Sequence, residues 1–352
     1  MSGTDYTRTK RDLLLELRQG KFKDSYSVAD ATVKFMRKVI AHGKWVTIED
    51  LIALLRSEGR SLIQAVPNNF VVGNMVKRVL KLVREENLRL QRGEEDEGSI
   101  ADPYESLNKL WEGGAGQRAA GVGHKQLRSS AIENINEFLL ELENCNDNIA
   151  AQAPDHVADG DSVMTCGYSA TVEAFLKAAA KKHRYKLYVA EGAPSYEGKQ
   201  LVETMKGVAN VEVIPIPDAK VFACMSQVNK VVLEADAVFA NGGLRASSGS
   251  YTLCLSAKHF SVPVIVCAAF YKLAPVFLSE DDHERFNVLV SPQPIVPYSD
   301  GELVGRVEIY NPAFDYVPPE LLTLFITNVS GNAPSYIYRL LNELCHPDDV
   351  EL

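Results

Sequence analysis

Residues 235–266 read ADAVFANGGLRASSGSYTLCLSAKHFSVPVIV, and this stretch decides the class of fold. Its pattern predicts a strand, a glycine turn, a helix near Ser248–His259 and a second strand over Val262–Cys267. Such a unit is typical of a parallel α/β sheet, in which polar groups just beyond the strand ends face the crevice that binds ligands. We therefore expect Asp236 and Asn241 to lie at that crevice.

The glycine pair after Asn241 favours an anionic ligand in this crevice. Gly242 and Gly243 let the backbone approach a ligand closely, and the next helix is expected to offer free N–H groups to an anion. No lysine follows the glycines closely, so part of the chemistry of a sugar-phosphate site is missing. The stretch is consistent with an active enzyme and with a protein that has lost its enzymatic activity. Turn formation alone also explains these residues.

The chain has 352 residues, which is enough for two domains. Its net charge of −9 argues against a general nucleic-acid-binding surface, because neutralising phosphates requires clustered lysine and arginine. The charged N-terminal residues lack the apolar segment of a signal peptide, and no apolar run approaches the roughly 20 residues that a membrane span requires. We therefore expect a cytoplasmic protein, in the cytosol, with the nucleus as the alternative location, and we expect it to bind neither nucleic acid nor membrane directly.

The cysteines show neither CxxC nor Cys/His spacing, so they predict no zinc site and no disulfide framework. We expect them to be small buried apolar residues in a reducing compartment. They are Cys145, Cys166, Cys224, Cys254, Cys267 and Cys345. No metal and no cofactor is expected from the sequence.

We divide the chain into an N-terminal helical domain, residues 1–153, and a second domain, residues 154–352. Apolar residues at helical spacing predict helices between Thr7 and Leu90, with an interruption at Gly59. Residues 91–123 are acidic and rich in glycine, and such a composition cannot support a packed core. We therefore expect a flexible loop there.

One predicted helix has a basic face. In GNMVKRVLKLVREE, residues 73–86, the apolar positions follow helical spacing. The basic residues that occupy other positions are Lys77, Arg78, Lys81 and Arg84. This face is either solvated or binds an acidic partner, and a solvated face is the commoner case.

A long helix is predicted over residues 125–153, and Pro154 ends it. Its apolar stripe consists of Leu127, Ile132, Ile135, Phe138, Leu139 and Leu142, and glutamates occupy the other side. Because this helix bridges the two domains, we expect it to fix their relative orientation.

After Pro154 the pattern changes to alternating strands and helices, which predicts a Rossmann-like α/β domain with a doubly wound parallel sheet. The predicted strands are Ser162–Cys166, Leu187–Ala190, Val211–Ile216, Lys230–Leu233 and Val262–Cys267. The predicted helices lie near Ser169–Lys182, Tyr196–Lys206, Ala219–Gln227 and Ser248–His259. Two further helices are predicted at Pro318–Thr327 and Pro334–Leu344, because each begins with proline. No GxGxxG opens the first strand–helix turn, so a dinucleotide site is not expected.

Four short segments of this domain are candidates to line one crevice at the strand ends. They are Thr165–Ser169, Glu191–Tyr196, Asp236 and Asn241–Gly243. Cys166 in the first segment is a candidate nucleophile, but no neighbouring His or Lys supplies the base that a reactive thiol requires, which favours a packing role. An acid–base role for Asp236 requires a partner group that the sequence does not show.

Several long segments make the chain similar to one superfamily. GDSVMTCGYSATVEAFLKAA at 160–179, YVAEGAPSYEG at 188–198, the ADAVFANGG stretch and NPAFDYVPPELLTLFITN at 311–328 resemble the isomerase-like superfamily. That superfamily joins methylthioribose-1-phosphate and ribose-1,5-bisphosphate isomerases to the alpha, beta and delta subunits of eukaryotic translation initiation factor 2B. The segments that most resemble the beta subunits are GNMVKRVLKLVREE, ENINEFLLELE at 133–143, NIAAQA at 148–153 and GNAPSYIYRLLNELCHPDD at 331–349.

The resemblance also implies that isomerase chemistry is incomplete. In the enzymes a cysteine after a Thr-His pair and a carboxylate move protons between sugar carbons C1 and C2. Asp236 matches the carboxylate, but Gly167 stands at the cysteine position and Cys166 at the histidine position. The enzymes' Asn-Lys pair is replaced by Ala246-Ser247, and their Arg-Pro by Val66-Pro67. The resemblance therefore implies a degenerate pocket made of Thr165, Cys166, Gly167, Asp236, Asn241, Gly242 and Gly243.

By this resemblance we expect a non-catalytic regulatory subunit of the guanine-nucleotide exchange factor for translation initiation factor 2. The delta subunit is the expected direct partner, and the alpha, gamma and epsilon subunits complete a decameric complex. That complex senses phosphorylation of the alpha subunit of initiation factor 2 and so regulates translation initiation. The alternative is an aldose–ketose isomerase that acts on a phosphorylated pentose.

Two surfaces are predicted for these contacts. Candidate contacts to initiation factor 2 lie on or next to the long helix, at Glu133, Glu137, Asn148 and His156, and a solvated helix face is an equal explanation. Residues Phe314–Leu344 carry several aromatic side chains and are a candidate surface for pairing with delta. Packing within the chain's own core is the other use for those aromatic residues.

Overall fold

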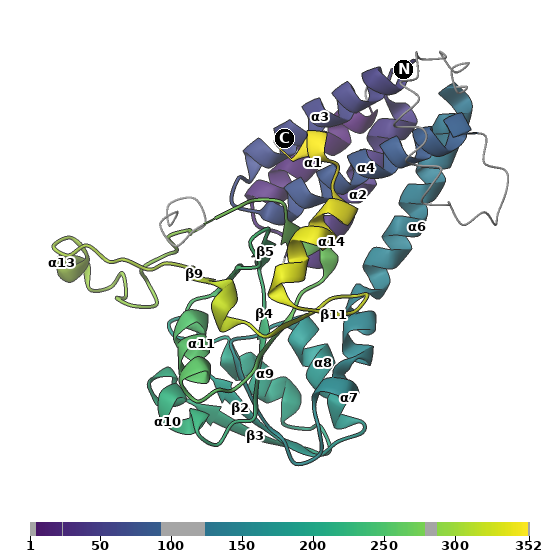
Figure 1. Ribbon diagram of the computed structural model, residues 1–352. Coiled ribbons are helices and arrows are strands. Elements are labelled where there is room, and N and C mark those ends of the chain that lie inside the picture. Colours follow the sequence, from purple (N-terminus) through teal and green to yellow (C-terminus); the bar gives the residue numbers. More distant parts are fainter. Residues whose placement is uncertain (1–4, 23, 93–123, 279–286, 351–352) are drawn as a thin grey trace.

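The computed structural model describes residues 5–22, 24–92, 124–278 and 287–350. Figure 1 shows a bundle of helices from the N-terminal part of the chain and, below it, a sheet surrounded by helices. The predicted loop 91–123 lies outside the described residues, apart from its first two positions, which belong to a helix. Within the described ranges, no helix combines the length and hydropathy that a membrane crossing requires.

Four helices form the bundle together with the first half of α6 (His124–Ala151). They are α1 (Asp5–Arg18), α2 (Ser25–His42), α3 (Ile48–Ala65) and α4 (Phe70–Arg92). At the start of α2 the Asp24 carboxylate accepts a hydrogen bond from the Ser27 N–H (3.0 Å). Thr47 and Asp50 form a capping box at the start of α3. The predicted helical character of this region is confirmed.

Helix α3 does not break at Gly59, so that detail of the prediction is wrong. Gly59 is buried against Val76 of α4, and a Cβ atom at this position would collide with the valine side chain. The glycine therefore allows two helices to pack closely and does not mark a turn.

Helix α6 connects the bundle to the sheet (Figure 1). It begins one residue before the predicted helix and ends two residues before its predicted end. Near its start Asn134 donates a hydrogen bond to the buried Glu86 of α4 (2.5 Å). Near its end Asn146 accepts one from Thr171 of the sheet part (3.0 Å). The chain continues into a short helix, α7 (Ala153–His156).

The main sheet has seven strands in the order β11-β10-β7-β4-β1-β2-β3. They are β1 (Ser162–Cys166), β2 (Tyr185–Ala190), β3 (Val211–Ile216), β4 (Lys230–Glu234), β7 (Val264–Cys267), β10 (Leu324–Ile326) and β11 (Gly331–Asn332). Every neighbouring pair is parallel except β10 with β11. The connecting helices are α8 (Ala170–Ala180), α9 (Gly198–Met205), α10 (Val221–Met225) and α11 (Ser250–His259). This strand order is of the Rossmann type, so the predicted α/β fold is confirmed.

A second, four-stranded sheet was not predicted. Its order is β8 (Leu273–Ala274), β5 (Ala237–Phe239), β6 (Leu244–Ser247) and β9 (Phe314–Val317). Strands β5 and β6 are antiparallel, so the glycines between them form a hairpin turn and not the predicted strand-to-helix turn. The reason is tertiary: β6 pairs along its whole length with β9, which lies far along the chain.

The helix predicted over Pro318–Thr327 is also wrong. A 3₁₀ turn, η3 (Pro319–Leu321), leads directly into strand β10, which pairs with β7 in the main sheet. Phe325 and Ile326 have no exposed surface, and a short, fully buried segment cannot be distinguished as strand or helix by periodicity. The remaining short helical elements are η1 (Asp218–Lys220), η2 (Phe270–Lys272), α13 (Gly301–Val304) and η4 (Pro334–Tyr336).

The C-terminal segment returns to the helical bundle (Figure 1). After α14 (Ile337–Leu344), the turn η5 (Pro347–Asp349) places the Asp349 carboxylate against helices α3 and α4. Asp349 has no exposed surface, and its carboxylate lies 2.6 Å from Arg56 Nη2 and 3.1 Å from Arg84 Nε. A buried carboxylate is stable in such a place because charged donors surround it.

The rest of the basic face of α4 binds backbone carbonyls of the same segment. Lys77 Nζ donates to the carbonyl of Val350 (2.9 Å), and Lys81 Nζ donates to that of Glu343 (2.6 Å) at the end of α14. Cations are favoured there, because the last carbonyls of a helix lack internal partners. This face is therefore neither solvated nor open to an external acidic partner.

We predict that Asp349→Asn lowers the free energy of unfolding by about 3 kcal/mol, because removing one member of a buried ion cluster leaves the other charges uncompensated. Urea unfolding followed by circular dichroism measures the change. Asp348→Asn is the matched control, since this neighbouring side chain is 66% exposed and should cost little. Equal effects of the two substitutions would contradict the role given to Asp349.

Candidate functional site

The carboxyl ends of β1 and β2 meet the start of α11 where the sequence predicts the crevice. Three glycines with positive φ lie there: Gly167 (70°), Gly192 (67°) and Gly249 (97°). A Cβ atom added at Gly167 would lie 3.6 Å from Ser247 Oγ, and one at Gly249 would lie 3.8 Å from Cys166 Sγ. The structure thus brings two of the four predicted segments together, those around Thr165–Ser169 and Glu191–Tyr196, and adds the end of β6.

The Cys166 thiol is poorly suited to act as a nucleophile. Burial, with a smaller contribution from the negative charges of Asp218, Asp315 and Glu197, raises its pKa to about 12. At neutral pH the thiol is therefore protonated, whereas a nucleophilic cysteine must be a thiolate. Asp218 itself accepts hydrogen bonds from the Gly192 N–H (3.0 Å) and the next N–H, and so holds the turn after β2.

The start of α11 does not offer its N–H groups to an external anion. The Asp315 carboxylate of β9 accepts from the N–H of Gly249 (2.8 Å) and of Tyr251 (3.1 Å). A carboxylate of the chain therefore occupies the position that the sequence left open for a phosphate, and that expectation is wrong. Ser247, which ends β6 two residues before Gly249, is exposed.

Asp236 is held in an ion pair that the sequence did not reveal. Arg245 Nε donates to its carboxylate (2.6 Å), and the arginine side chain is only 3% exposed. The guanidinium carbon lies 4.6 Å from the ring centre of Phe70 and 4.3 Å from that of Phe314, and a further donor reaches the Asn68 carbonyl (2.9 Å). The pairing of β5 with β6 creates this contact, so local sequence gave no signal for it.

The glycine turn after β5 is closed by packing and does not face the crevice, contrary to the prediction. Asn241 Nδ2 donates to the carbonyl of Leu278 (2.8 Å) and to the Tyr316 hydroxyl (2.7 Å). Gly242 and Gly243 are buried, and a Cβ atom on Gly243 would lie 2.5 Å from the Tyr316 hydroxyl oxygen. The glycines are required for this close approach within the chain.

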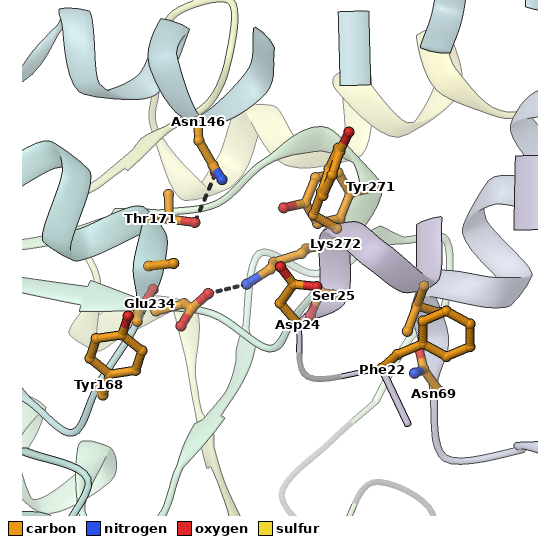
Figure 2. Close-up of a pocket in the computed structure, with 14 residues that line it drawn as sticks. Phe22, Asp24, Ser25, Asn69, Asn146, Tyr168, Thr171, Glu234, Tyr271 and Lys272 are labelled. Atoms are coloured by element: carbon orange, nitrogen blue, oxygen red, sulfur yellow. Dashed lines mark hydrogen bonds and ion pairs between the residues drawn. The ribbon is translucent and has the colours of Figure 1, made fainter. Parts of the chain in front are cut away.

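A polar cavity of 310 Å³ lies between the start of α2 and the ends of β1 and β4. Figure 2 shows Lys272 and Glu234 among its lining residues, where these two form an ion pair. The other labelled polar side chains include Asp24, Asn69 and Asn146. Sequence reasoning missed this cavity, although Glu234 directly ends a buried strand, which is where such sheets bind ligands. In the described part of the chain, no cluster of three or more His, Cys, Asp or Glu residues is placed to hold a metal ion.

Three of the four candidate contacts to initiation factor 2 share one exposed side of α6. Glu133, Glu137 and Asn148 are exposed, and their spacings of four and eleven residues are close to whole helical turns. Leu140, which is 60% exposed, lies on the same side. His156 is on α7 and half-buried, and burial lowers its pKa, so it stays neutral at pH 7.

Comparison with known proteins identifies the relatives of this fold and site. The sequence model of the initiation factor 2 subunit family matches residues 21–334. The chain belongs to this family. Within it, the chain is 36% identical to translation initiation factor eIF2B subunit beta of Dictyostelium discoideum, over 96% of this chain and 95% of that protein. It is 34% identical to the eIF2B subunit beta of Schizosaccharomyces pombe, over 97% and 96% of the two chains.

This family member also resembles an isomerase and several solved structures. Ribose 1,5-bisphosphate isomerase of Archaeoglobus fulgidus is 30% identical over 64% of this chain and 71% of the enzyme. The crystal structure of eIF2B beta from Chaetomium thermophilum has the same fold, with a TM-score of 0.73 and 24% identity over 99% of this chain and 93% of that one. A chain of the tetrameric eIF2B beta2–delta2 complex from the same organism gives a TM-score of 0.71 at 25% identity, over 97% and 96% of the two chains. The resemblance to the beta subunits drawn from the sequence is confirmed.

We predict that Cys166 reacts with iodoacetamide far more slowly in the folded chain than in urea. A thiol with a pKa of about 12 is almost fully protonated at pH 8, whereas an unfolded cysteine with a pKa of about 8.5 is roughly one-quarter thiolate. Because folding favours the neutral thiol, its contribution to stability is present below the unfolded pKa and is lost as pH rises toward 12. Mass spectrometry of the Cys166 peptide gives the rate against pH. A plateau of rapid labelling near pH 7 would mean that the site holds a thiolate.

Proposed function

We propose that this chain is a non-catalytic regulatory subunit of the guanine-nucleotide exchange factor for translation initiation factor 2. The observation that carries the proposal is the pair of Asp236 with the buried Arg245, which binds the carboxylate that an isomerase would use for proton transfer. The 34–36% identity to eIF2B beta subunits over nearly the whole chain supports the same conclusion.

The chemistry of aldose–ketose isomerisation explains why this pair matters. The reaction requires groups that take a proton from one sugar carbon and return it to the next, with pKa values near the working pH. Cys166 is protonated because its pKa is about 12, and the Asp236 carboxylate is paired with a guanidinium. Asp218 and Asp315 add negative charge where a sugar phosphate would have to bind. Such a crevice disfavours both the anionic substrate and the proton transfer.

The proposed partners follow from the same family. The solved beta2–delta2 complex of related proteins supports direct pairing of this chain with a delta subunit. We extend this pairing to the alpha, gamma and epsilon subunits in a decameric, cytosolic complex. In that complex the epsilon subunit carries the exchange activity, and this chain contributes binding energy only.

The proposed regulation is a shift between two arrangements of the complex. The alpha subunit of initiation factor 2 contacts Glu133, Glu137 and Asn148 of α6, with His156 beside them. When that subunit is phosphorylated on serine it binds better to one arrangement of the regulatory core, and exchange slows because this arrangement becomes more populated. Helix α6 is suited to transmit the difference, since it bonds to α4 at one end and to α8 at the other.

We predict that Glu137→Lys weakens binding of initiation factor 2 about tenfold, because the substitution reverses a charge on the proposed contact surface. The complex is purified from cells through a tag on this chain, its subunits are identified, and the affinity for initiation factor 2 is measured. Glu143→Lys is the matched control, since Glu143 is exposed on another side of the same helix. If the tagged chain is recovered without the other four subunits, the proposed function is contradicted. If the Glu137→Lys variant no longer assembles with those subunits, α6 has a structural role only.

The alternative function, an aldose–ketose isomerase, is favoured by the retained Asp236 and by the resemblance to the A. fulgidus enzyme. We predict that the purified chain yields no ketose from ribose-1,5-bisphosphate or methylthioribose-1-phosphate, because the Cys166 thiol is protonated and Arg245 binds the Asp236 carboxylate. Product formation is followed by chromatography against a known isomerase as the positive control. Turnover that Asp236→Asn abolishes would establish the alternative.

A further inference from the structure

The polar cavity of 310 Å³ lies where the helical bundle, α6 and the sheet part meet. It is lined by the first residues of α2 and α8, by Asn146 of α6, by Glu234 at the end of β4 and by part of η2. Ser169, Thr171 and Lys272 in this lining are each at most 7% exposed, so the cavity has a buried polar interior. The residues of the degenerate pocket, all of them described, do not line it. It is therefore a separate site, of a volume that suits a small molecule.

The start of α8 forms one side of the cavity. Ala170 and Thr171 line it here, and the N–H groups of a helix's first turn have no carbonyl partners within the helix. The buried Ser169 accepts a hydrogen bond at Oγ from the Val172 N–H (3.3 Å), and among the described residues its hydroxyl proton has no acceptor. At α11 the Asp315 carboxylate takes the equivalent N–H groups, whereas no described carboxylate does so at α8. This side therefore suits the carboxylate of a ligand.

Two carboxamide groups add donors to the cavity. Asn146 Oδ1 accepts from the Thr171 hydroxyl (3.0 Å), and Asn69 Oδ1 accepts from the Val71 N–H (3.1 Å). Each asparagine keeps its NH2 group as a donor, and neither NH2 group has an acceptor among the described residues. A carboxamide donates without adding charge, so these groups can bind a ligand carboxylate and leave the charges of the lining unchanged.

The start of α2 forms another side, and the field there is negative. The Asp24 carboxylate caps α2 through one oxygen, which accepts from the Ser27 N–H (3.0 Å), and its other oxygen has no donor among the residues that the structure describes. Partial burial raises the pKa of the Tyr26 hydroxyl, and nearby carboxylates raise it as well. These carboxylates are Asp30, Glu143 and Asp24, and the Lys34 ammonium has the opposite effect. This side therefore attracts a cation.

The rest of the lining is neutral overall and partly apolar. Lys272 and Glu234 form an ion pair, so their charges cancel (Figure 2). A ligand with two negative charges, such as a phosphate ester, would meet the carboxylates of both Asp24 and Glu234 and is disfavoured. The side chains with large apolar surfaces in this lining are Phe22, Tyr26, Val28 and Tyr168. The cavity as a whole favours a ligand with one carboxylate, one ammonium and an apolar group.

We propose that this cavity binds a free amino acid with an apolar side chain. Its carboxylate lies at the start of α8, its ammonium lies toward Asp24, and its side chain packs against the aromatic residues of the lining. The bound amino acid contacts α2, α6 and α8 at once, because all three line the cavity. It therefore touches, at Asn146, the helix that carries the proposed contacts to initiation factor 2. Binding itself does not depend on the proposed function, since every group that makes the site belongs to this chain.

The test is calorimetric titration of the full chain with L-leucine and L-phenylalanine. We expect saturable binding, and we expect analogues that lack one charged group to bind at least about tenfold more weakly, because each loses its contacts on one side of the cavity. Leucinol lacks the carboxylate, and 4-methylpentanoate lacks the ammonium. Hydrogen–deuterium exchange of the unmodified chain should slow at the starts of α2 and α8 when the amino acid is bound.

Asp24→Asn separates the charge of this residue from its role as a helix cap. Asparagine caps helices as well as aspartate does, so the variant should fold. We expect it to bind L-leucine about tenfold more weakly and to bind 4-methylpentanoate no more weakly than the unmodified chain does. Asp30→Asn is the matched control, since it makes the same charge change on α2 at a residue that pairs with Lys34 and does not line the cavity. Its affinity for L-leucine should fall less than about threefold.

The outcomes distinguish this inference from the proposed function. If neither amino acid binds, or if Asp24→Asn and Asp30→Asn have equal effects, the site is wrongly assigned while the proposed function stands. If leucinol or 4-methylpentanoate binds as tightly as L-leucine, or if ribose binds in its place, the class of ligand is wrong. If L-leucine binds as expected but the tagged chain is recovered without the other subunits, the proposed function fails and the amino acid site stands.

Discussion

The buried carboxylate of Asp349, between Arg56 and Arg84, joins the last turn of the chain to the first helices. This ion cluster and the neighbouring lysine–carbonyl bonds hold the C-terminal segment on α4. Two more contacts then join the bundle to the sheet part, from Arg245 to the Asn68 carbonyl and from Asn74 to the Tyr271 carbonyl (3.0 Å). These contacts hold the bundle against the sheet part at points apart from the covalent link through α6.

Charged groups at and near the strand ends are neutralised inside the chain. Asp236 binds Arg245, Glu234 binds Lys272, and Asp315 takes the N–H groups of α11. Each of these groups would otherwise be available to a ligand. A Rossmann-like sheet brings polar groups to its strand ends whatever the function, so the fold alone does not decide between catalysis and regulation. The partners that each polar group finds inside the chain favour regulation.

The proposed contact surface for initiation factor 2 lies on one exposed side of α6. The contact side of α6 is polar and acidic, which suits a reversible encounter with a substrate factor.

The sequence by itself determined the local elements: β1 and β3 match their predicted bounds, and α6 differs by at most two residues, because regular apolar spacing is a local property. It also located Cys166 and Asp236 through family resemblance. Tertiary structure alone decided the second sheet, the strand β10 in place of a helix, and the partners of Asp236, Asp315 and the basic face of α4. The Asp236–Arg245 pair depends on the hairpin of β5 and β6, and the other features depend on pairing between segments far apart in the chain. Side-chain periodicity holds no information about which segment supplies the partner.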